Sequence, residues 1–237
     1  MLIGISGKIN SGKDLVFHML LYLELDTQLS FVEYYEKYKN RNFYFIENKK
    51  CAETLKNVLC LLLGCTREQL EDREFKEKPL GEEWWYYKIY VGNGKYELVN
   101  YLVNDKPEGW VSIANPRYLI KPTPRLLLQL LGTECGRNII HPNVWVNSLF
   151  STYSPTKSNW VVTDIRFPNE ADKILELGGT LIRLERPGKV SGSTHESETA
   201  LDNYKSFDTI IVNDGDITDL YNKIVSISHT FSKLNKP

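Results

Sequence analysis

The chain has 237 residues, 42% of them hydrophobic and 25% charged, which is the ordinary composition of a globular protein with one sizeable core. Its formal net charge of −1 excludes a nucleic-acid or membrane surface that acts through bulk charge. The chain enters an apolar run at once, without the segments of a signal peptide, and no apolar run approaches the roughly 20 residues that span a bilayer. We therefore expect no nucleic-acid partner and no membrane partner.

The four cysteines form no C-x-x-C pair, and no histidine stands at metal-ligand spacing from them. Cysteines without such a pattern are more often reduced thiols in or near the core. We expect Cys51, Cys60, Cys65 and Cys135 to be thiols of this kind, in a protein of the cytoplasm.

The first motif of the chain follows its first apolar run. Gly7–Asp14 comes directly after Leu2–Ile5 and opens an amphipathic stretch at Lys13, an order typical of the phosphate-binding loop G-x-x-x-x-G-K-[ST]. The glycines allow backbone N–H groups to point at a phosphate, and Lys13 would reach the terminal phosphates of a nucleotide. Asp14 stands where the motif has a hydroxyl, so it must act through Mg²⁺ or its water shell, or turn away. A glycine-rich turn without a ligand is the alternative.

Apolar residues then recur at helical spacing from Leu15 to Leu23 and from Ala52 to Leu62, where Gly64 is placed to end the second helix. Between these helices, Phe43–Ile46 is short, aromatic and β-branched, and it predicts a second strand.

The stretch 73–120 differs in composition from its surroundings and predicts an insertion into an α/β plan. Two aromatic, β-prone runs, Trp84–Val91 and Tyr96–Val103, flank Gly92–Gly94 and predict a β-hairpin. Its aromatic residues favour a small satellite core, with stacking on a nucleotide base as the alternative.

A further helix is predicted from the Thr123-Pro124 capping signal to about Gly136. Leucines occupy one side of this helix. The opposite side carries Arg125, Gln129, Gly132 and Gly136. A flat ligand lying against the helix would suit this set, and an ordinary solvent face is the alternative.

Trp160–Thr163 is a continuous β-rich run that predicts a central parallel strand. Asp164 would lie at its carboxyl end, where open α/β sheets bind ligands, and is a candidate partner for Mg²⁺ or substrate. Arg166 is a candidate phosphate clamp because a guanidinium offers two parallel donors. Capping or a salt bridge at the strand end is the alternative role for Asp164.

The rest of the chain continues the alternation, with a helix at 169–177, strands at 180–184 and 208–212, and a last helix from Ile217. Strands alternating with helices indicate a parallel sheet with helices on both faces. We predict an α/β fold with a five-stranded parallel sheet and the inserted hairpin, in a single domain over 1–237.

In this order, the motifs resemble those of the deoxynucleoside monophosphate kinases of tailed bacteriophages, of T-even type, within the P-loop kinase superfamily. The segments that carry the resemblance are Gly7–Asp14, Pro124–Thr133, Val162–Glu170, Arg186–Gly188, Thr194–Glu198 and Asn213–Gly215. The resemblance implies the P-loop kinase fold, a lid-like loop at about 187–206 and transfer of the γ-phosphoryl of ATP to a deoxynucleoside 5′-monophosphate with Mg²⁺. It also implies a role in nucleotide supply for DNA synthesis, a possible homodimer and the host cytoplasm.

The same resemblance assigns roles to residues. Lys13, Arg125, Asp164 and Arg166 are the expected catalytic residues. The expected ATP-binding residues are Gly7, Asn10, Ser11, Gly12, Lys13, Asp14, Arg186, Asn213 and Gly215. The expected acceptor-binding residues are Lys56, Arg125, Gln129, Thr133, Trp145, Asp164, Arg166 and Glu170. His195 and Glu198 are the lid candidates. Asp14 and Asp164 are expected to hold Mg²⁺ through water; the family usually places Thr after this Asp, whereas Leu15 follows here.

Two other functions remain open from the sequence. A P-loop kinase for another small acceptor, such as dephospho-coenzyme A, shares the fold and the Asn-x-Gly ending. A nucleotide-binding switch without transfer chemistry is the other alternative, although Asn222-Lys223 is followed by Ile224 and Val225 and so does not form the guanine-specificity motif Asn-Lys-x-Asp.

Overall fold

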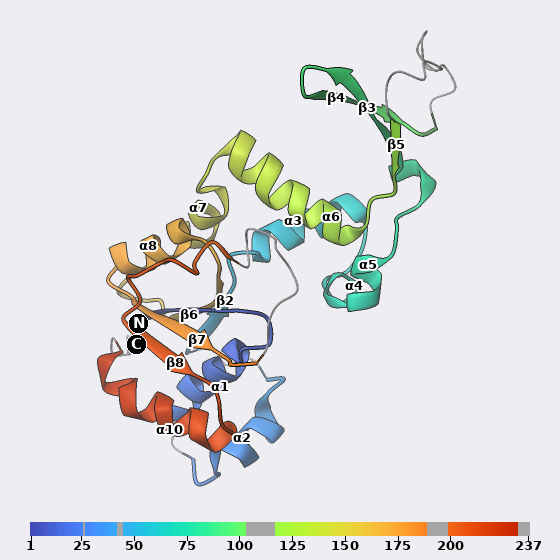
Figure 1. Cartoon of the computed structure of the whole chain (residues 1–237). Coiled ribbons are helices and arrows are strands. Elements are labelled where there is room, and N and C mark those ends of the chain that lie inside the picture. The colour runs from blue at the N-terminus through green and yellow to red at the C-terminus, as the bar shows by residue number, and fades with distance from the viewer. Residues whose placement is uncertain (26, 42–44, 103–116, 189–198, 232–237) are drawn as a thin grey trace. The chain divides into compact units, whose positions relative to one another are not determined.

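The computed structural model describes residues 1–25, 27–41, 45–102, 117–188 and 199–231 (Figure 1). The chain divides into two compact units, the first formed by residues 1–54 and 143–237 and the second by residues 55–142. Each unit has its own sheet. Among the residues described, no helix is long and apolar enough to cross a membrane.

The first unit is built on five parallel strands in the order β2-β6-β1-β7-β8 (Figure 1). The strands are β1 Leu2–Gly7, β2 Glu47–Lys49, β6 Trp160–Ile165, β7 Thr180–Glu185 and β8 Thr209–Val212. Because β1 lies between β6 and β7, the loop that follows it leaves the sheet at the middle of its carboxyl edge. Open α/β sheets bind their ligands at this edge.

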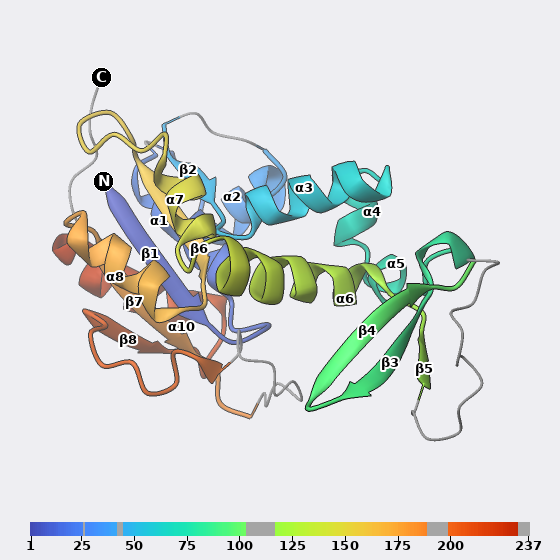
Figure 2. The same cartoon turned by 90° about the horizontal axis from the view of Figure 1, so that it is seen from above.

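Helices cover both faces of this sheet (Figure 2). Successive side chains of a strand alternate between the faces, so Ile3 and Ile5 belong to one core and Leu2 to the other. The helices that pack on the face of Ile3 and Ile5 are α1 Lys13–Leu23, α2 Phe31–Tyr38 and α10 Ile217–Ile227. The helices that pack on the other face are α7 Val144–Phe150 and α8 Pro168–Glu176.

The predicted fold class is confirmed, since the sheet has five parallel strands with helices on both faces. The predicted position of the second strand is wrong: residues 42–44 lie outside the described part, and the strand is formed by Glu47–Lys49. Among the described strands it lies at the sheet edge and pairs with β6 alone, and its side chains are partly or fully exposed. It therefore lacks the apolar pattern that marks a central strand.

The second unit contains a three-stranded antiparallel sheet in the order β4-β3-β5. Its strands are β3 Tyr86–Gly92, β4 Lys95–Asn100 and β5 Arg117–Ile120. The predicted hairpin is confirmed, and β5 adds a third strand that the sequence did not indicate. The rings of Trp85 and Tyr87 pack against Tyr101, and Lys121 Nζ lies 3.9 Å from the centre of the Trp85 ring. These rings contact one another but stay partly exposed, so the interpretation of the aromatic residues as a satellite core stays a prediction.

Helices make up the rest of the second unit: α3 Glu53–Leu63, which starts with the last two residues of the first unit's segment 1–54, α4 Arg67–Glu71, α5 Arg73–Glu77 and α6 Pro124–Gln129, with a 3₁₀ turn at Glu82–Trp84. The start of α6 is as predicted, because Thr123 Oγ1 accepts a hydrogen bond from Leu126 N at 3.2 Å and Pro124 is the first helical residue. The helix does not stop at Gly136. It continues as a π-helix over Leu130–Ile140.

Candidate active site

The glycine-rich segment between β1 and α1 forms a compact loop with its amide-rich turn at the carboxyl edge of the sheet. Gly12 has φ +104°, a conformation that favours glycine, and Ser11 N donates to Lys8 O at 3.2 Å. A Cβ on Gly7 would lie 2.6 Å from Leu184 O, so only glycine fits between the loop and β7. The predicted strand, loop and helix are therefore all present at the predicted places.

The side chain of Lys13 lies over this loop. Its Nζ donates to Gly7 O at 2.6 Å and to Lys8 O at 2.8 Å. The ammonium is thus kept beside the loop amides by two carbonyl oxygens. This is the place from which it can bind an anion that the loop surrounds.

Two further predicted residues hold the outer side of the loop. Asn213 Nδ2 donates to Ser11 O at 2.8 Å in a buried contact, and Arg186 Nη1 donates to Asn10 O at 3.3 Å. Gly215 lies at the start of α10, where a Cβ would clash with the side chain of Asp219 at 2.3 Å. Within the predicted segment Asn213–Gly215, Asn213 thus contacts the loop, whereas Gly215 packs against Asp219.

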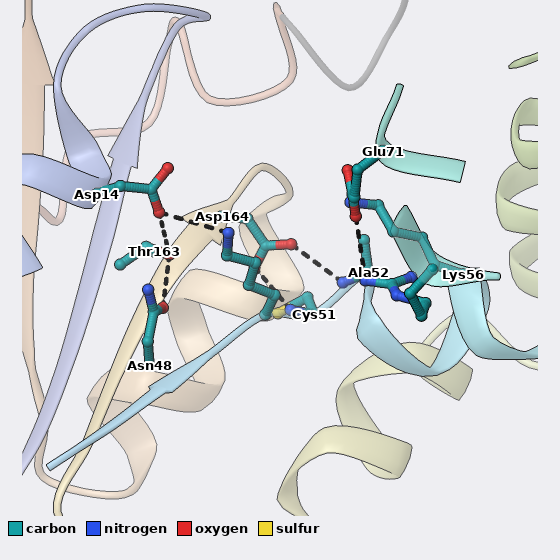
Figure 3. A network of polar contacts seen from close by, with 10 residues as sticks. Asp14, Asn48, Cys51, Ala52, Lys56, Glu71, Thr163 and Asp164 are labelled. Carbon is teal, nitrogen blue, oxygen red and sulfur yellow. Dashed lines mark hydrogen bonds and ion pairs between the residues drawn. The ribbon is translucent and has the colours of Figure 1, made fainter. Parts of the chain in front are cut away.

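Asp14 is the second residue of α1 and its side chain is 70% exposed. Its carboxylate accepts from Thr163 Oγ1 at 3.5 Å and lies 3.4 Å from Lys50 Nζ. Thr163 also donates to Asn48 Oδ1 at 2.8 Å, so oxygen atoms from α1, β2 and β6 meet at this point (Figure 3). Such a set of hard oxygen donors is suited to a hydrated divalent cation.

Asp164 lies near the carboxyl end of β6, as predicted, and its carboxylate is occupied by main-chain donors (Figure 3). Cys51 N donates to one carboxylate oxygen at 2.6 Å and Ala52 N to the other at 3.1 Å. These amides precede the first turn of α3, so Asp164 caps the start of that helix. The capping role that the sequence left as an alternative is thus present, and each oxygen keeps a lone pair for another partner.

Glu170 is 2% exposed and accepts from Arg166 N at 2.7 Å and from Phe167 N at 3.2 Å. Its carboxylate therefore closes the start of α8 as a helix cap. Arg166 lines a small pocket beside the phosphate loop, and Trp145 is buried in α7 with 7% exposure.

The other predicted acceptor residues belong to the second unit. Lys56 Nζ lies 2.7 Å from Glu71 Oε1 (Figure 3), and Arg125 pairs through Nε with Glu77 Oε1. Burial would raise the pKa of Glu71, but the hydrogen bond and charge of Lys56, with Lys76 and Arg67, outweigh it and hold that pKa below its ordinary value.

Gln129 ends α6 and Thr133 lies in the π-helix, both partly exposed. His195 and Glu198, the predicted lid residues, lie outside the described residues.

Sequence reasoning missed two residues, Arg183 and Asp202, that contact the loop or the strand before it. Arg183 Nη1 donates to Ser6 Oγ at 3.0 Å, and Asp202 accepts from both Arg183 and Lys8. An arginine inside the otherwise apolar strand Thr180–Leu184 was the available signal, because a charge in a buried strand needs a partner. No comparable pattern marks Asp202.

A central parallel strand, a glycine-bounded loop and a lysine folded over that loop define an α/β protein with a phosphate-binding loop. The order and contacts of these parts are those of proteins that bind nucleotide phosphates. The chain belongs to the deoxynucleotide monophosphate kinase family, whose model matches residues 92–224. The phosphate loop precedes the matched range, so it supports the assignment independently.

Curated relatives agree with this family. The chain is 37% identical over 125 residues to a putative deoxynucleotide monophosphate kinase of Acanthamoeba polyphaga mimivirus, covering 48% of this chain and 65% of that protein. It is 28% identical over 200 residues to the deoxynucleoside-5′-monophosphate kinase of Escherichia phage T5, covering 74% of this chain and 72% of that protein. It is 30% identical over 141 residues to the deoxynucleotide monophosphate kinase of Enterobacteria phage T4, covering 57% and 56%. The matches thus span less than two thirds of the mimivirus and T4 proteins.

Proposed function

We propose that this protein transfers the γ-phosphoryl group of ATP to a deoxynucleoside 5′-monophosphate, giving ADP and the deoxynucleoside diphosphate, in viral nucleotide supply for DNA synthesis. The observation that carries the proposal is the position of Lys13, held by Gly7 O and Lys8 O over a glycine-bounded loop. Its family, deoxynucleotide monophosphate kinase, supplies the acceptor class and ATP as the phosphoryl donor.

The phosphate loop would bind the β- and γ-phosphates of ATP. The loop amides and the start of α1 provide donors and a positive dipole end, and Lys13 provides a full charge. Asn213 and Arg186 hold the loop carbonyls of Ser11 and Asn10, so the loop is kept in shape before a nucleotide binds. Phosphoryl transfer depends on this alignment and on neutralising the charge of the transferred group.

A magnesium ion fits the residues around Asp14. Ser11 is 2% exposed and its Oγ has no hydrogen-bond partner among the described residues, and the side chain of Asp14 is 70% exposed with Thr163 and Lys50 beside one of its oxygens. Within the described chain no three His, Cys, Asp or Glu side chains gather into a metal cage, so Ser11 and Asp14 would share the ion with phosphate oxygens and water. When bound, Mg²⁺ neutralises charge on the polyphosphate; Asp164 is the second candidate ligand.

The acceptor contacts are proposals that rest on the resemblance and on charge. Arg166 lines the pocket beside Gly7 and can offer its guanidinium to the α-phosphate of the acceptor. Lys56, Arg125, Gln129 and Thr133 of the second unit, together with Trp145, His195, Glu198 and Glu170, stay predictions for acceptor or lid contacts. A homodimer also stays a prediction, which sedimentation of the purified chain would test.

The proposed function is tested by measuring ADP release with ATP, Mg²⁺ and each deoxynucleoside monophosphate in turn, with dephospho-coenzyme A as the comparison acceptor. We expect turnover with at least one deoxynucleoside monophosphate and none with dephospho-coenzyme A. Lys13→Ala should lower kcat by about 100-fold or more, because one preorganised charge at the reacting group is removed, while the melting temperature stays within a few degrees.

Two results would contradict the proposal. Turnover with dephospho-coenzyme A alone would make the protein a kinase of another acceptor. Tight ATP binding by calorimetry without release of ADP above the Lys13→Ala background for any acceptor would make it a binding module.

A further inference from the structure

A buried arginine lies beside the phosphate loop and takes no part in the roles given above. Arg183 is 9% exposed on β7, directly opposite Ser6 in the strand register, and its Nη1 donates to Ser6 Oγ at 3.0 Å. A guanidinium with so little exposure needs a compensating anion.

Asp202 is that anion, and it has two cationic partners. Its Oδ1 accepts from Arg183 Nη2 at 3.1 Å, and its Oδ2 lies 3.2 Å from Lys8 Nζ. The neighbouring residue Leu201 is 4% exposed and packs in the core on the α8 face of the sheet. The chain at Asp202 is therefore held by the packing of its neighbour, and the carboxylate is held by a buried arginine.

Lys8 connects this pair to the lysine that would bind phosphate. It is the second residue of the loop, and its carbonyl oxygen accepts from Lys13 Nζ at 2.8 Å and from Ser11 N at 3.2 Å. The side chain of Lys8 is thus held by Asp202, and its main chain holds Lys13. An unbroken series of contacts runs from β7 to the phosphate-binding ammonium.

The carboxylate of Asp202 lies among cations beside the phosphate loop. Asp202 is shared by two cations, and a third, Arg166, lines the same water-sized pocket of about 10 Å³. The residues lining that pocket are Ser6, Gly7, Lys8, Ile165, Arg166, Arg183 and Leu201. A carboxylate beside a site for polyphosphate repels the substrate, so its benefit must lie in what it holds in place.

We propose that Asp202 is a positioning residue of the phosphate loop. Its carboxylate is held by the buried Arg183 and in turn holds the side chain of Lys8, and this places the carbonyl oxygen of Lys8 that accepts from Lys13. The kinetic consequence rests on the proposed function, since it assumes that the loop binds ATP. The structural consequence, that Asp202 steadies the loop, does not depend on the proposed function.

The test is Asp202→Asn, which keeps an oxygen for Arg183 and removes the charge that attracts Lys8. We expect the KM for ATP to rise about tenfold with kcat changed less than about twofold, because a charge-assisted contact that orders the free loop is lost. Amide hydrogen exchange of the peptide 7–13 should become faster. The melting temperature should also fall, by about 5 °C or more, because the buried Arg183 loses its compensating charge; the partly exposed Lys8 pair adds little to this fall.

Asp172→Asn is the matched control. Asp172 Oδ1 accepts from Tyr204 Oη at 2.6 Å, which anchors the same segment two residues further on without contacting the loop. This variant should leave the ATP KM and the exchange of peptide 7–13 unchanged. Lys8→Met should reproduce the effects of Asp202→Asn on the ATP KM and on the exchange of peptide 7–13, although it keeps the Arg183–Asp202 pair. In these two readouts the double variant should be no worse than either single one.

The proposal is overturned if Asp202→Asn leaves both the KM and the loop exchange unchanged, if it lowers the KM, or if its effects on the KM and the loop exchange add to those of Lys8→Met. If the unmodified protein has no kinase activity, the proposed function fails by itself. The exchange of peptide 7–13 and the calorimetric affinity for ADP then take the place of the KM, so the role of Asp202 is still decided.

Discussion

Gly12 is the residue at which the phosphate loop turns into α1, and its backbone conformation requires glycine. Its φ of +104° lies in the left-handed region, and a Cβ there would be 3.0 Å from Asn213 Nδ2, the amide that holds Ser11 O. Gly12→Ala should therefore cost about 1 kcal/mol of folding free energy and also displace Asn213. We expect the ATP KM to rise about tenfold, measured with the ADP-release assay, alongside a modest fall in melting temperature.

Gly178→Ala separates backbone strain from the effect on the loop. Gly178 has φ +74°, and nothing lies within 4 Å of the position of a Cβ. It precedes β7, at the opposite edge of the sheet from the carboxyl ends. This variant should lose a similar amount of stability while keeping the ATP KM of the unmodified protein. An equal rise in KM for both variants would show that general destabilisation, and not the geometry of the loop, limits ATP binding.

At the scale of elements, Asp164 links the carboxyl end of β6 to the start of α3. Its two oxygens accept from Cys51 N and Ala52 N, so removing the side chain leaves two helix-start amides without their acceptor. Asp164→Ala should lower the free energy of unfolding by about 1 to 2 kcal/mol, the usual cost of losing a cap, as measured by urea denaturation.

Asp164→Asn tests whether this residue also serves the reaction. The amide keeps one acceptor oxygen for the helix start and removes the charge, so we expect most of the stability to remain. If Asp164 also contacts the metal or the substrate, kcat should fall about 100-fold in this variant. A variant with nearly full activity would assign Asp164 to the helix cap alone.

The elements could be predicted where the sequence carries a local signal. The loop at Gly7–Asp14 and the hairpin around Gly92–Gly94 have glycines that fix the turn, so their places were predicted correctly. The strand at Glu47–Lys49 has no such signal, because an edge strand with polar, partly exposed side chains lacks the apolar pattern.

The site could be predicted only in part, because some of its contacts join residues far apart in the chain. Asp202 meets Lys8 across 194 positions, and no local pattern indicates that pairing. The carboxyl-end position of Asp164 was predictable from the strand before it. Its capping of α3 was not, since that depends on how the turn at Cys51-Ala52 approaches β6.

At the scale of the whole molecule, the core of the first unit contains a buried phenol, that of Tyr34, whose ionisation at high pH opposes folding. Tyr34 of α2 is 1% exposed, and its ring packs against those of Tyr22, Phe31 and Tyr38. Burial raises the pKa of Tyr34 to about 12, and burial with the neighbouring Asp172 carboxylate raises that of Tyr204 to about 12. Both groups are therefore held protonated in the folded chain.

A phenol whose pKa is higher in the folded than in the unfolded chain favours folding as long as it is protonated. Its contribution is complete below the unfolded value near 10 and is lost as the pH rises from there through about 12. We expect the melting temperature to stay level up to about pH 10 and then to fall, with Tyr34 contributing about 2 kcal/mol at most. Tyr34→Phe should make this fall less steep, because phenylalanine does not ionise.

Tyr96→Phe, at an exposed position on β4, is the control and should follow the unmodified protein. Identical pH profiles for Tyr34→Phe and the unmodified chain would show that ionisation of this buried phenol does not drive alkaline unfolding.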